Sequence, residues 1–208
     1  MAEIYYYINS ENAGGVVECG LKLSEHFSKD VMIKGEKKKC ISALLNPKDD
    51  MDKYRSPYYK CLKFELPPDY CFVGDRYMYK VGLGYPEAMK IYIDTIVPIN
   101  SYIFGSFRLP EGLVTTTVLP DQISVLDKRL DSPVLFDNSE EFYINNIIEI
   151  YKEENGDFND AMLYYFYSRL AEDKKLKKIE DSEKKIAVFI DAGRGKTFSI
   201  KVPDISKY

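Results

Sequence analysis

IYYYINSENAGGVVECGLKLS, at residues 4–24, is the stretch from which the fold is first predicted. It begins with β-branched and aromatic residues, which favour a strand. Asn9 or Ser10 then suits the cap of a helix, because a short polar side chain can accept a hydrogen bond from the first turn. Gly20 is a typical helix stop. The chain is therefore expected to open with a strand, a short helix and a glycine.

Two later segments extend this pattern. Residues 40–51 (CISALLNPKDDM) predict a strand that ends in a turn at Asn46 and Pro47. Residues 109–123 (LPEGLVTTTVLPDQI) place one acid, Glu111, at the start of an apolar strand rich in Thr and Val. In this order the three segments suggest a nucleotide-binding cleft that contains a single carboxylate.

The last third of the chain has a different character. Apolar residues recur there at helical spacing in two runs, and two strand-like segments follow at residues 186–190 and 197–202. The fold class expected is α+β. We expect residues 1–130 to form a core of two small packed antiparallel sheets with helices. Residues 131–208 are expected to form a helical pair and a β-hairpin that pack on this core, either as an appendage or as part of one continuous domain.

Composition limits the classes of function. The net charge is −4, which argues against a general nucleic-acid coat. The N-terminal sequence lacks the basic region of a signal peptide, and no apolar run approaches the ~20 residues that cross a bilayer, so we expect a cytoplasmic protein without membrane contact. Four cysteines without a CxxC pair and a single histidine do not form a metal-ligand pattern, so no metal is expected.

Together the segments resemble the DarT-type ADP-ribosyltransferases. Those proteins begin with a Tyr-His-x-Thr strand, an Asn-containing helix and Gly-Leu. They then carry an Asn-Pro-Arg-x-x-Met turn and place a catalytic Glu before a Leu-Val strand. The resemblance covers about residues 4–125 and assigns the helix Asn to Asn12, the turn to Lys48 and Met51, and the catalytic Glu to Glu111.

The chain departs from this pattern at three polar positions. Counting back from Asn12, Tyr6 stands at the family's histidine and Ile8 at its threonine. Lys48 replaces the turn arginine, and a lysine meets a phosphate as a point charge without the two-pronged hydrogen bonding of a guanidinium.

The resemblance implies transfer of ADP-ribose from NAD to a macromolecular acceptor. Glu111 would stabilise an oxocarbenium-like transition state, since departure of the cationic nicotinamide needs no general acid. Tyr6, Asn12, Lys48 and Met51 would bind the dinucleotide. The acceptor is nucleic acid or protein. The basic residues 34–39 are interpreted as a solvated loop, with a phosphate-attracting rim as the alternative.

Two further hypotheses remain open. The chain is alternatively a catalytically inactive module on this fold that binds a nucleotide or a protein partner. A third hypothesis is a toxin- or phage-associated protein that inhibits such an enzyme by mimicry. An enzyme must direct Tyr6, Lys48 and Glu111 into one cavity, so the position of these side chains distinguishes the hypotheses.

Overall fold

The computed structural model describes residues 1–126 and 138–204. The chain divides into two compact units, Met1–Asn146 and Ile147–Tyr208, and each unit is described here by itself. The boundary between the units falls inside helix α6 (Ser139–Glu154). The boundary expected between residues 130 and 131 lies outside the described residues.

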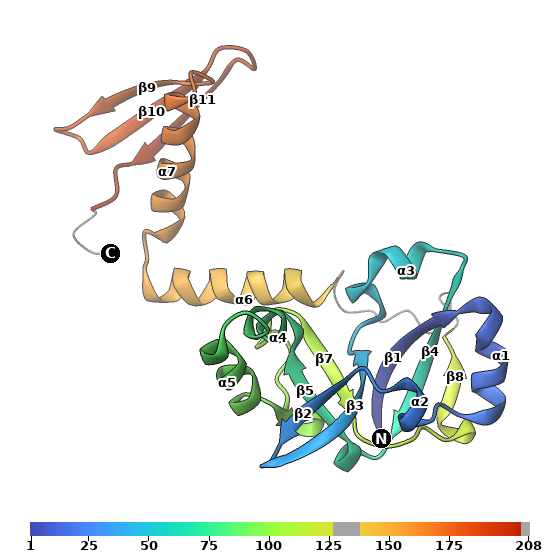
Figure 1. Cartoon of the computed structure of the whole chain (residues 1–208). Coiled ribbons are helices and arrows are strands. Elements are labelled where there is room, and N and C mark those ends of the chain that lie inside the picture. Colours follow the sequence, from blue (N-terminus) through green and yellow to red (C-terminus); the bar gives the residue numbers. More distant parts are fainter. Residues whose placement is uncertain (127–137, 205–208) are drawn as a thin grey trace. The chain divides into compact units, whose positions relative to one another are not determined.

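The first unit is built on one curled antiparallel sheet (Figure 1). Seven strands follow one another in the order β6-β5-β7-β3-β1-β4-β8, and β2 pairs with β3 beside this path. Two packed sheets were expected for this part of the chain. Within the described residues the strands form a single curled sheet instead, and the α+β class is confirmed. The strands are β1 (Ala2–Asn9), β2 (Lys29–Ile33), β3 (Glu36–Leu44), β4 (Tyr59–Leu66), β5 (Cys71–Asp75), β6 (Val97–Pro98), β7 (Pro110–Val114) and β8 (Ile123–Val125).

Both faces of this sheet carry apolar clusters. The main core lies on one face, where the helix α1 adds Val16 to the side chains of the strands. The opposite face carries a cluster around Tyr92 and Leu113 and another around Tyr5 and Leu44. The helices of this unit are α1 (Ser10–Cys19), α2 (Leu23–His26), α3 (Met51–Arg55), α4 (Arg76–Gly82), α5 (Pro86–Asp94) and the first turns of α6.

Residues 34–39 are a hairpin instead of the predicted solvated loop. Lys34 and Gly35 have positive φ angles of 54° and 82° and form a tight turn between β2 and β3. A turn with two positive φ angles matches the right-handed twist of the strands that it joins. The lysines that follow belong to the exposed half of β3, where their side chains point to alternate faces of the strand.

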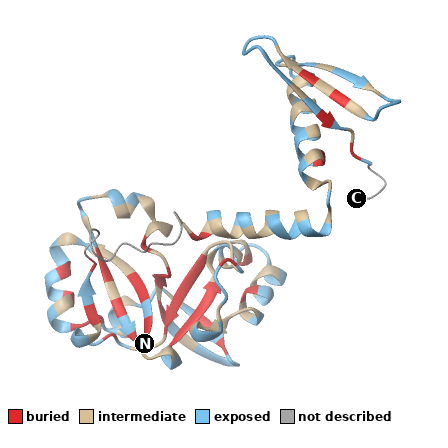
Figure 2. Ribbon diagram, turned by 180° about the vertical axis from the view of Figure 1, so that it is seen from behind, coloured by how far each residue is buried: buried red, intermediate tan, exposed pale blue. Residues whose placement is uncertain are grey.

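The second unit combines helix α7 (Phe158–Glu172) with a three-stranded antiparallel sheet. The sheet has the order β11-β10-β9, with β9 at Lys177–Asp181, β10 at Ile186–Asp191 and β11 at Lys196–Lys201. The predicted hairpin is confirmed as β10 and β11, and β9 is an additional strand. Tyr164 and Tyr167 of α7 pack on Phe189, and buried residues occur on the middle strand β10, on β11 and on α7 (Figure 2).

No helix in residues 1–126 and 138–204 combines the length and the apolar character needed to cross a membrane. Nor do these residues contain a group of three or more His, Cys, Asp and Glu side chains that is arranged to hold a metal ion.

Candidate functional site

Glu111 lies inside the protein, on strand β7, which pairs with β5 on one side and β3 on the other. Glu111 is fully buried, and the other residues of β7 are also buried. The carboxylate accepts hydrogen bonds from Lys29 Nζ at 2.6 Å, from Ser42 Oγ at 2.5 Å and from Tyr92 OH at 3.2 Å. These donors come from β2, β3 and α5, so the cluster joins four elements that are far apart in the sequence.

Lys29 balances the charge of Glu111 within this cluster. Its side chain is 9% exposed, and its ammonium also lies 3.7 Å from the ring centroid of Tyr79. Burial and then the charge of Glu111 raise the pKa of Tyr92, so its hydroxyl stays a hydrogen-bond donor. Burial likewise raises the pKa of the neighbouring Cys40 thiol to about 11. The cluster therefore satisfies the carboxylate with protein groups in a site closed to solvent.

The close approach of Tyr92 to Glu111 depends on a glycine of β5. Gly74 pairs with Glu111 across the sheet. A Cβ atom on Gly74 would lie 2.9 Å from Cε2 of Tyr92 and 3.1 Å from its hydroxyl oxygen. The missing side chain thus leaves room for the Tyr92 ring beside Glu111.

Tyr6 lies on the opposite face of the sheet from Glu111. It packs against the main core and stacks on Phe64, with the ring centroids 5.9 Å apart. The register explains this, because Tyr5 pairs with Leu44, which pairs in turn with Glu111. Cross-strand pairs point to one face and neighbours along a strand alternate, so the β1 residues that share the face of Glu111 are Tyr5 and Tyr7.

Tyr7 is a residue that the sequence analysis missed. Its hydroxyl donates a hydrogen bond of 2.8 Å to the carbonyl oxygen of Pro47, in the turn that precedes Lys48. Burial and the neighbouring Cys61 raise the pKa of Tyr7. Tyr7 therefore connects β1 to the predicted ligand-binding turn, which Tyr6 does not. The alternation in the Tyr5-Tyr6-Tyr7 run shows that Tyr7 and Tyr6 lie on opposite faces, but only the pairing of the strands shows which of them shares the face of Glu111.

Lys48 and Met51 line one pocket, as a shared ligand site requires. The pocket has a volume of about 390 Å³, and Arg55, Asn138 and Glu141 also line it among the described residues. The turn is held by Asn46, whose side-chain oxygen accepts a hydrogen bond of 2.9 Å from the Lys48 amide. The structure thus brings together two of the predicted residues and adds a second cation, Arg55.

Two hydrogen bonds between Ser139 and Asp49, beside this pocket, attach the start of α6 to the same turn. The Ser139 amide and hydroxyl donate hydrogen bonds of 2.7 and 2.8 Å to the two carboxylate oxygens of Asp49. Burial raises the pKa of Asp49, although the hydrogen bonds from Ser139 oppose the rise. Asp49 therefore holds Asn138 and Glu141, on either side of Ser139, close to Lys48.

Asn12 is apart from both groups. It is an exposed residue of α1, whose buried residues Ala13 and Val16 face the sheet. Val16 belongs to the main core, on the face opposite Glu111. The structure thus separates the predicted site residues into three places: the Glu111 cluster, the Lys48 pocket, and the face that carries Tyr6 and α1.

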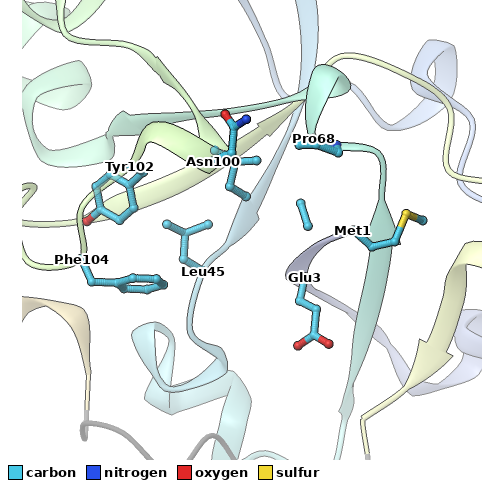
Figure 3. Close-up of a pocket in the computed structure, with 9 residues that line it drawn as sticks. Met1, Glu3, Leu45, Pro68, Asn100, Tyr102 and Phe104 are labelled. Carbon is cyan, nitrogen blue, oxygen red and sulfur yellow. The ribbon is translucent and has the colours of Figure 1, made fainter.

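A second pocket lies near the start of β1 (Figure 3). Its volume is about 430 Å³, and it contains none of the predicted site residues. Apolar side chains provide most of its wall, which is formed by Met1, Ala2, Glu3, Leu45, Pro68, Ile99, Asn100, Tyr102 and Phe104.

Comparison of the chain with family models, with curated proteins and with solved structures gave no match.

Proposed function

We propose that the first unit is a nucleotide-binding module that resembles an ADP-ribosyltransferase and does not transfer ADP-ribose. The observation that carries this proposal is the complete burial of Glu111, whose carboxylate accepts hydrogen bonds from Lys29, Ser42 and Tyr92. A catalytic carboxylate must reach the ribose of NAD to stabilise its developing positive charge. Glu111 makes its contacts within the protein instead.

The pocket at Lys48 has the chemistry of a nucleotide site. Lys48 and Arg55 provide two cations for a pyrophosphate, and Asn138 and Glu141 provide oxygen atoms that can accept hydrogen bonds from ribose hydroxyls. Its volume of about 390 Å³ falls within the range of about 300–1,000 Å³ that is usual for small-molecule sites. The expected ligand is a nucleotide that carries a pyrophosphate.

Calorimetric titration tests this proposal. ADP-ribose, NAD and AMP are titrated into the wild type and into Lys48→Ala/Arg55→Ala. Loss of the two cations should weaken ADP-ribose binding about a hundredfold or more, because charge-assisted hydrogen bonds contribute roughly 1.5–3 kcal/mol each. AMP, which lacks the pyrophosphate, should bind more weakly than ADP-ribose.

The matched control is Lys80→Ala/Lys90→Ala, which removes two exposed cations from α4 and α5. Its affinity for ADP-ribose should equal that of the wild type. Absence of binding to the wild type, or equal binding by the pocket variant, would contradict the proposal.

A second candidate function is transfer of ADP-ribose from NAD to nucleic acid or protein. One observation favours it: Glu111, Ser42 and Tyr5 lie on the neighbouring strands β7, β3 and β1, and the Glu111 carboxylate accepts the Ser42 hydrogen bond. A carboxylate in a buried polar cluster is a frequent feature of active sites. In this case Lys29 must move away from Glu111 before NAD can reach the carboxylate.

Nicotinamide release separates the two candidates. The wild type and Glu111→Gln are incubated with NAD, alone and with nucleic acid or a protein extract as the acceptor. A binding module releases no nicotinamide under any of these conditions. Release by the wild type that Glu111→Gln abolishes would replace the first proposal with the second.

A further inference from the structure

We infer that strand β9 of the second unit is a self-association edge, which pairs antiparallel with β9 of a second copy of this chain. β9 (Lys177–Asp181) is an edge strand, since the sheet order is β11-β10-β9. No strand among the described residues pairs with its outer side. Such an edge presents a row of backbone donors and acceptors to a further strand.

The charges of β9 are self-complementary. Its sequence is Lys-Lys-Ile-Glu-Asp, with two cations before Ile179 and two anions after it. In an antiparallel pair centred on Ile179, Lys177 lies opposite Asp181 of the second copy, and Lys178 lies opposite Glu180. Two-fold symmetry repeats both pairs, so four cross-strand pairs of opposite charge form.

Neighbouring registers lack this match. A pair centred on Lys178 places two Lys178 side chains opposite each other, and one centred on Glu180 places two Glu180 side chains together. Like charges directly opposite each other are unfavourable. The sequence of β9 therefore favours one register for pairing with β9 of a second copy. An edge strand that carries charges of one sign would oppose such pairing in all registers.

Ile179 adds an apolar contact at the centre of this pair. It is 49% exposed, although it lies in a strand. Lys178 and Glu180 point toward α7, where both contact the Tyr164 hydroxyl and form an ion pair with each other at 2.7 Å, so a second copy would extend this pair into a network. Ile179 points to the other face of the sheet, together with Val188, its pairing partner on β10. The two Ile179 side chains of a symmetric pair cover each other on that face.

The association should be weak and sensitive to salt. β9 has five residues, and exposed ion pairs are individually weak and screened by ions. Sedimentation velocity on the full chain, over a range of protein concentrations at low salt, should show a monomer–dimer equilibrium. The dimer fraction should fall as salt is added.

Charge reversal identifies the edge. Lys178→Glu places two carboxylates opposite each other in the symmetric pair, and Glu180→Lys places two ammonium groups opposite each other, so each variant alone should be monomeric. An equimolar mixture of the two variants restores opposite charges at both positions and should form a heterodimer. The matched controls Lys196→Glu on β11 and Glu183→Lys in the β9–β10 turn should dimerise like the wild type.

Disulfide trapping provides a second measurement. In an antiparallel pair the Cα atoms of opposed residues are about 4.5–5.5 Å apart, which a disulfide can span. Ile179→Cys in a Cys19→Ala background should therefore form a covalent dimer on oxidation. The control Thr197→Cys, on the other edge strand, should remain monomeric.

Each outcome bears on the inference. Loss of the dimer in both single variants, with recovery in the mixture, supports it. A wild type that stays monomeric at all concentrations would overturn it, as would a dimer that both reversals leave unchanged. Failure of the mixture to recover, with both variants folded by circular dichroism, would also overturn it.

Discussion

At the scale of the residue, the unusual feature is a carboxylate inside a sheet that is otherwise apolar at its centre. Glu111 is fully buried between Leu44 and Gly74, its neighbours across the strands. A buried charge is costly unless an opposite charge and hydrogen bonds accompany it. Lys29 supplies the charge, and Ser42 and Tyr92 supply the further hydrogen bonds.

Lys29→Met should strongly destabilise the first unit. The substitution leaves Glu111 charged and without its ammonium partner. Removal of one partner from a buried ion pair lowers the free energy of unfolding by about 3–5 kcal/mol. The double variant Lys29→Met/Glu111→Leu removes both charges and should lose less stability than the single variant. Urea unfolding of the single and double variants measures the difference.

The exposed pair of Lys22 and Glu25 is the control. Their side chains are 60% and 58% exposed, with the charged atoms 3.0 Å apart. Lys22→Met should cost at most about 1 kcal/mol, because water already solvates both groups. An equally small cost for Lys29→Met would mean that Glu111 does not depend on its ion pair.

Asp49 should give the protein a pH dependence that Asp49→Asn lacks. Burial raises its pKa above the ordinary 3.8, so the folded chain binds this proton more tightly than the unfolded chain. As the pH rises from about 3.8 through the raised value, the folded state loses that advantage. The stability of the wild type relative to Asp49→Asn should therefore fall over this interval.

Urea unfolding of both proteins at a series of pH values checks the sign of this effect. A stability difference that rises with pH would show that the hydrogen bonds from Ser139 outweigh burial at Asp49. A constant difference would show that the two effects cancel.

Individual contacts were the least predictable feature from sequence. The composition of residues 4–8 predicts a strand, and β1 confirms it. Yet the face that each tyrosine occupies depends on the pairing of Tyr5 with Leu44, which no local pattern specifies. In the same way, Lys29 and Glu111 are 82 positions apart and meet only through the sheet.

At the scale of the element, strands with strong apolar patterns were predicted well. The strand expected before the turn at Asn46 and Pro47 is the end of β3 (Glu36–Leu44), and the apolar strand expected at Glu111 is β7 (Pro110–Val114). β2 and β9 were missed because charged residues make up much of each. Their strand conformation comes from pairing with β3 and β10, a tertiary effect that exceeds intrinsic propensity.

Two glycine substitutions should change the stability of the protein in opposite directions. Gly74→Ala in β5 places Cβ 2.9 Å from the Tyr92 ring and should destabilise the protein by about 1–3 kcal/mol. Gly14→Ala in α1 meets no atom within 4 Å and should stabilise it by about 0.5–1 kcal/mol, since alanine favours a helix. Thermal unfolding of both variants measures the two shifts.

A double variant tests which part of the Tyr92 side chain collides with a Cβ atom at position 74. Gly74→Ala/Tyr92→Phe removes the hydroxyl oxygen, which lies 3.1 Å from the added Cβ, but keeps the ring carbon at 2.9 Å. If contact with the ring causes the destabilisation by Gly74→Ala, this double variant should recover little of the lost stability. Full recovery would instead assign the cost to the hydroxyl and its hydrogen bond to Glu111.

At the scale of the whole molecule, each unit has its own hydrophobic core. Phe64 belongs to the main core of Met1–Asn146, and Phe189 to the core of Ile147–Tyr208; neither ring is exposed. Composition and periodicity predicted a change of character along the chain. They did not predict a unit boundary within α6, because apolar residues continue through this helix without interruption.

Separate cores predict separate unfolding. Phe64→Ala and Phe189→Ala should each cost about 3–5 kcal/mol in the unit that contains the substitution, since each empties a fully buried position. Hydrogen exchange measured by mass spectrometry on the full chain should then accelerate in one unit alone. For Phe189→Ala this is the region of α7 and β9–β11; for Phe64→Ala it is the region of β1–β8. Faster exchange in both units for either variant would show that the two cores unfold as one cooperative unit.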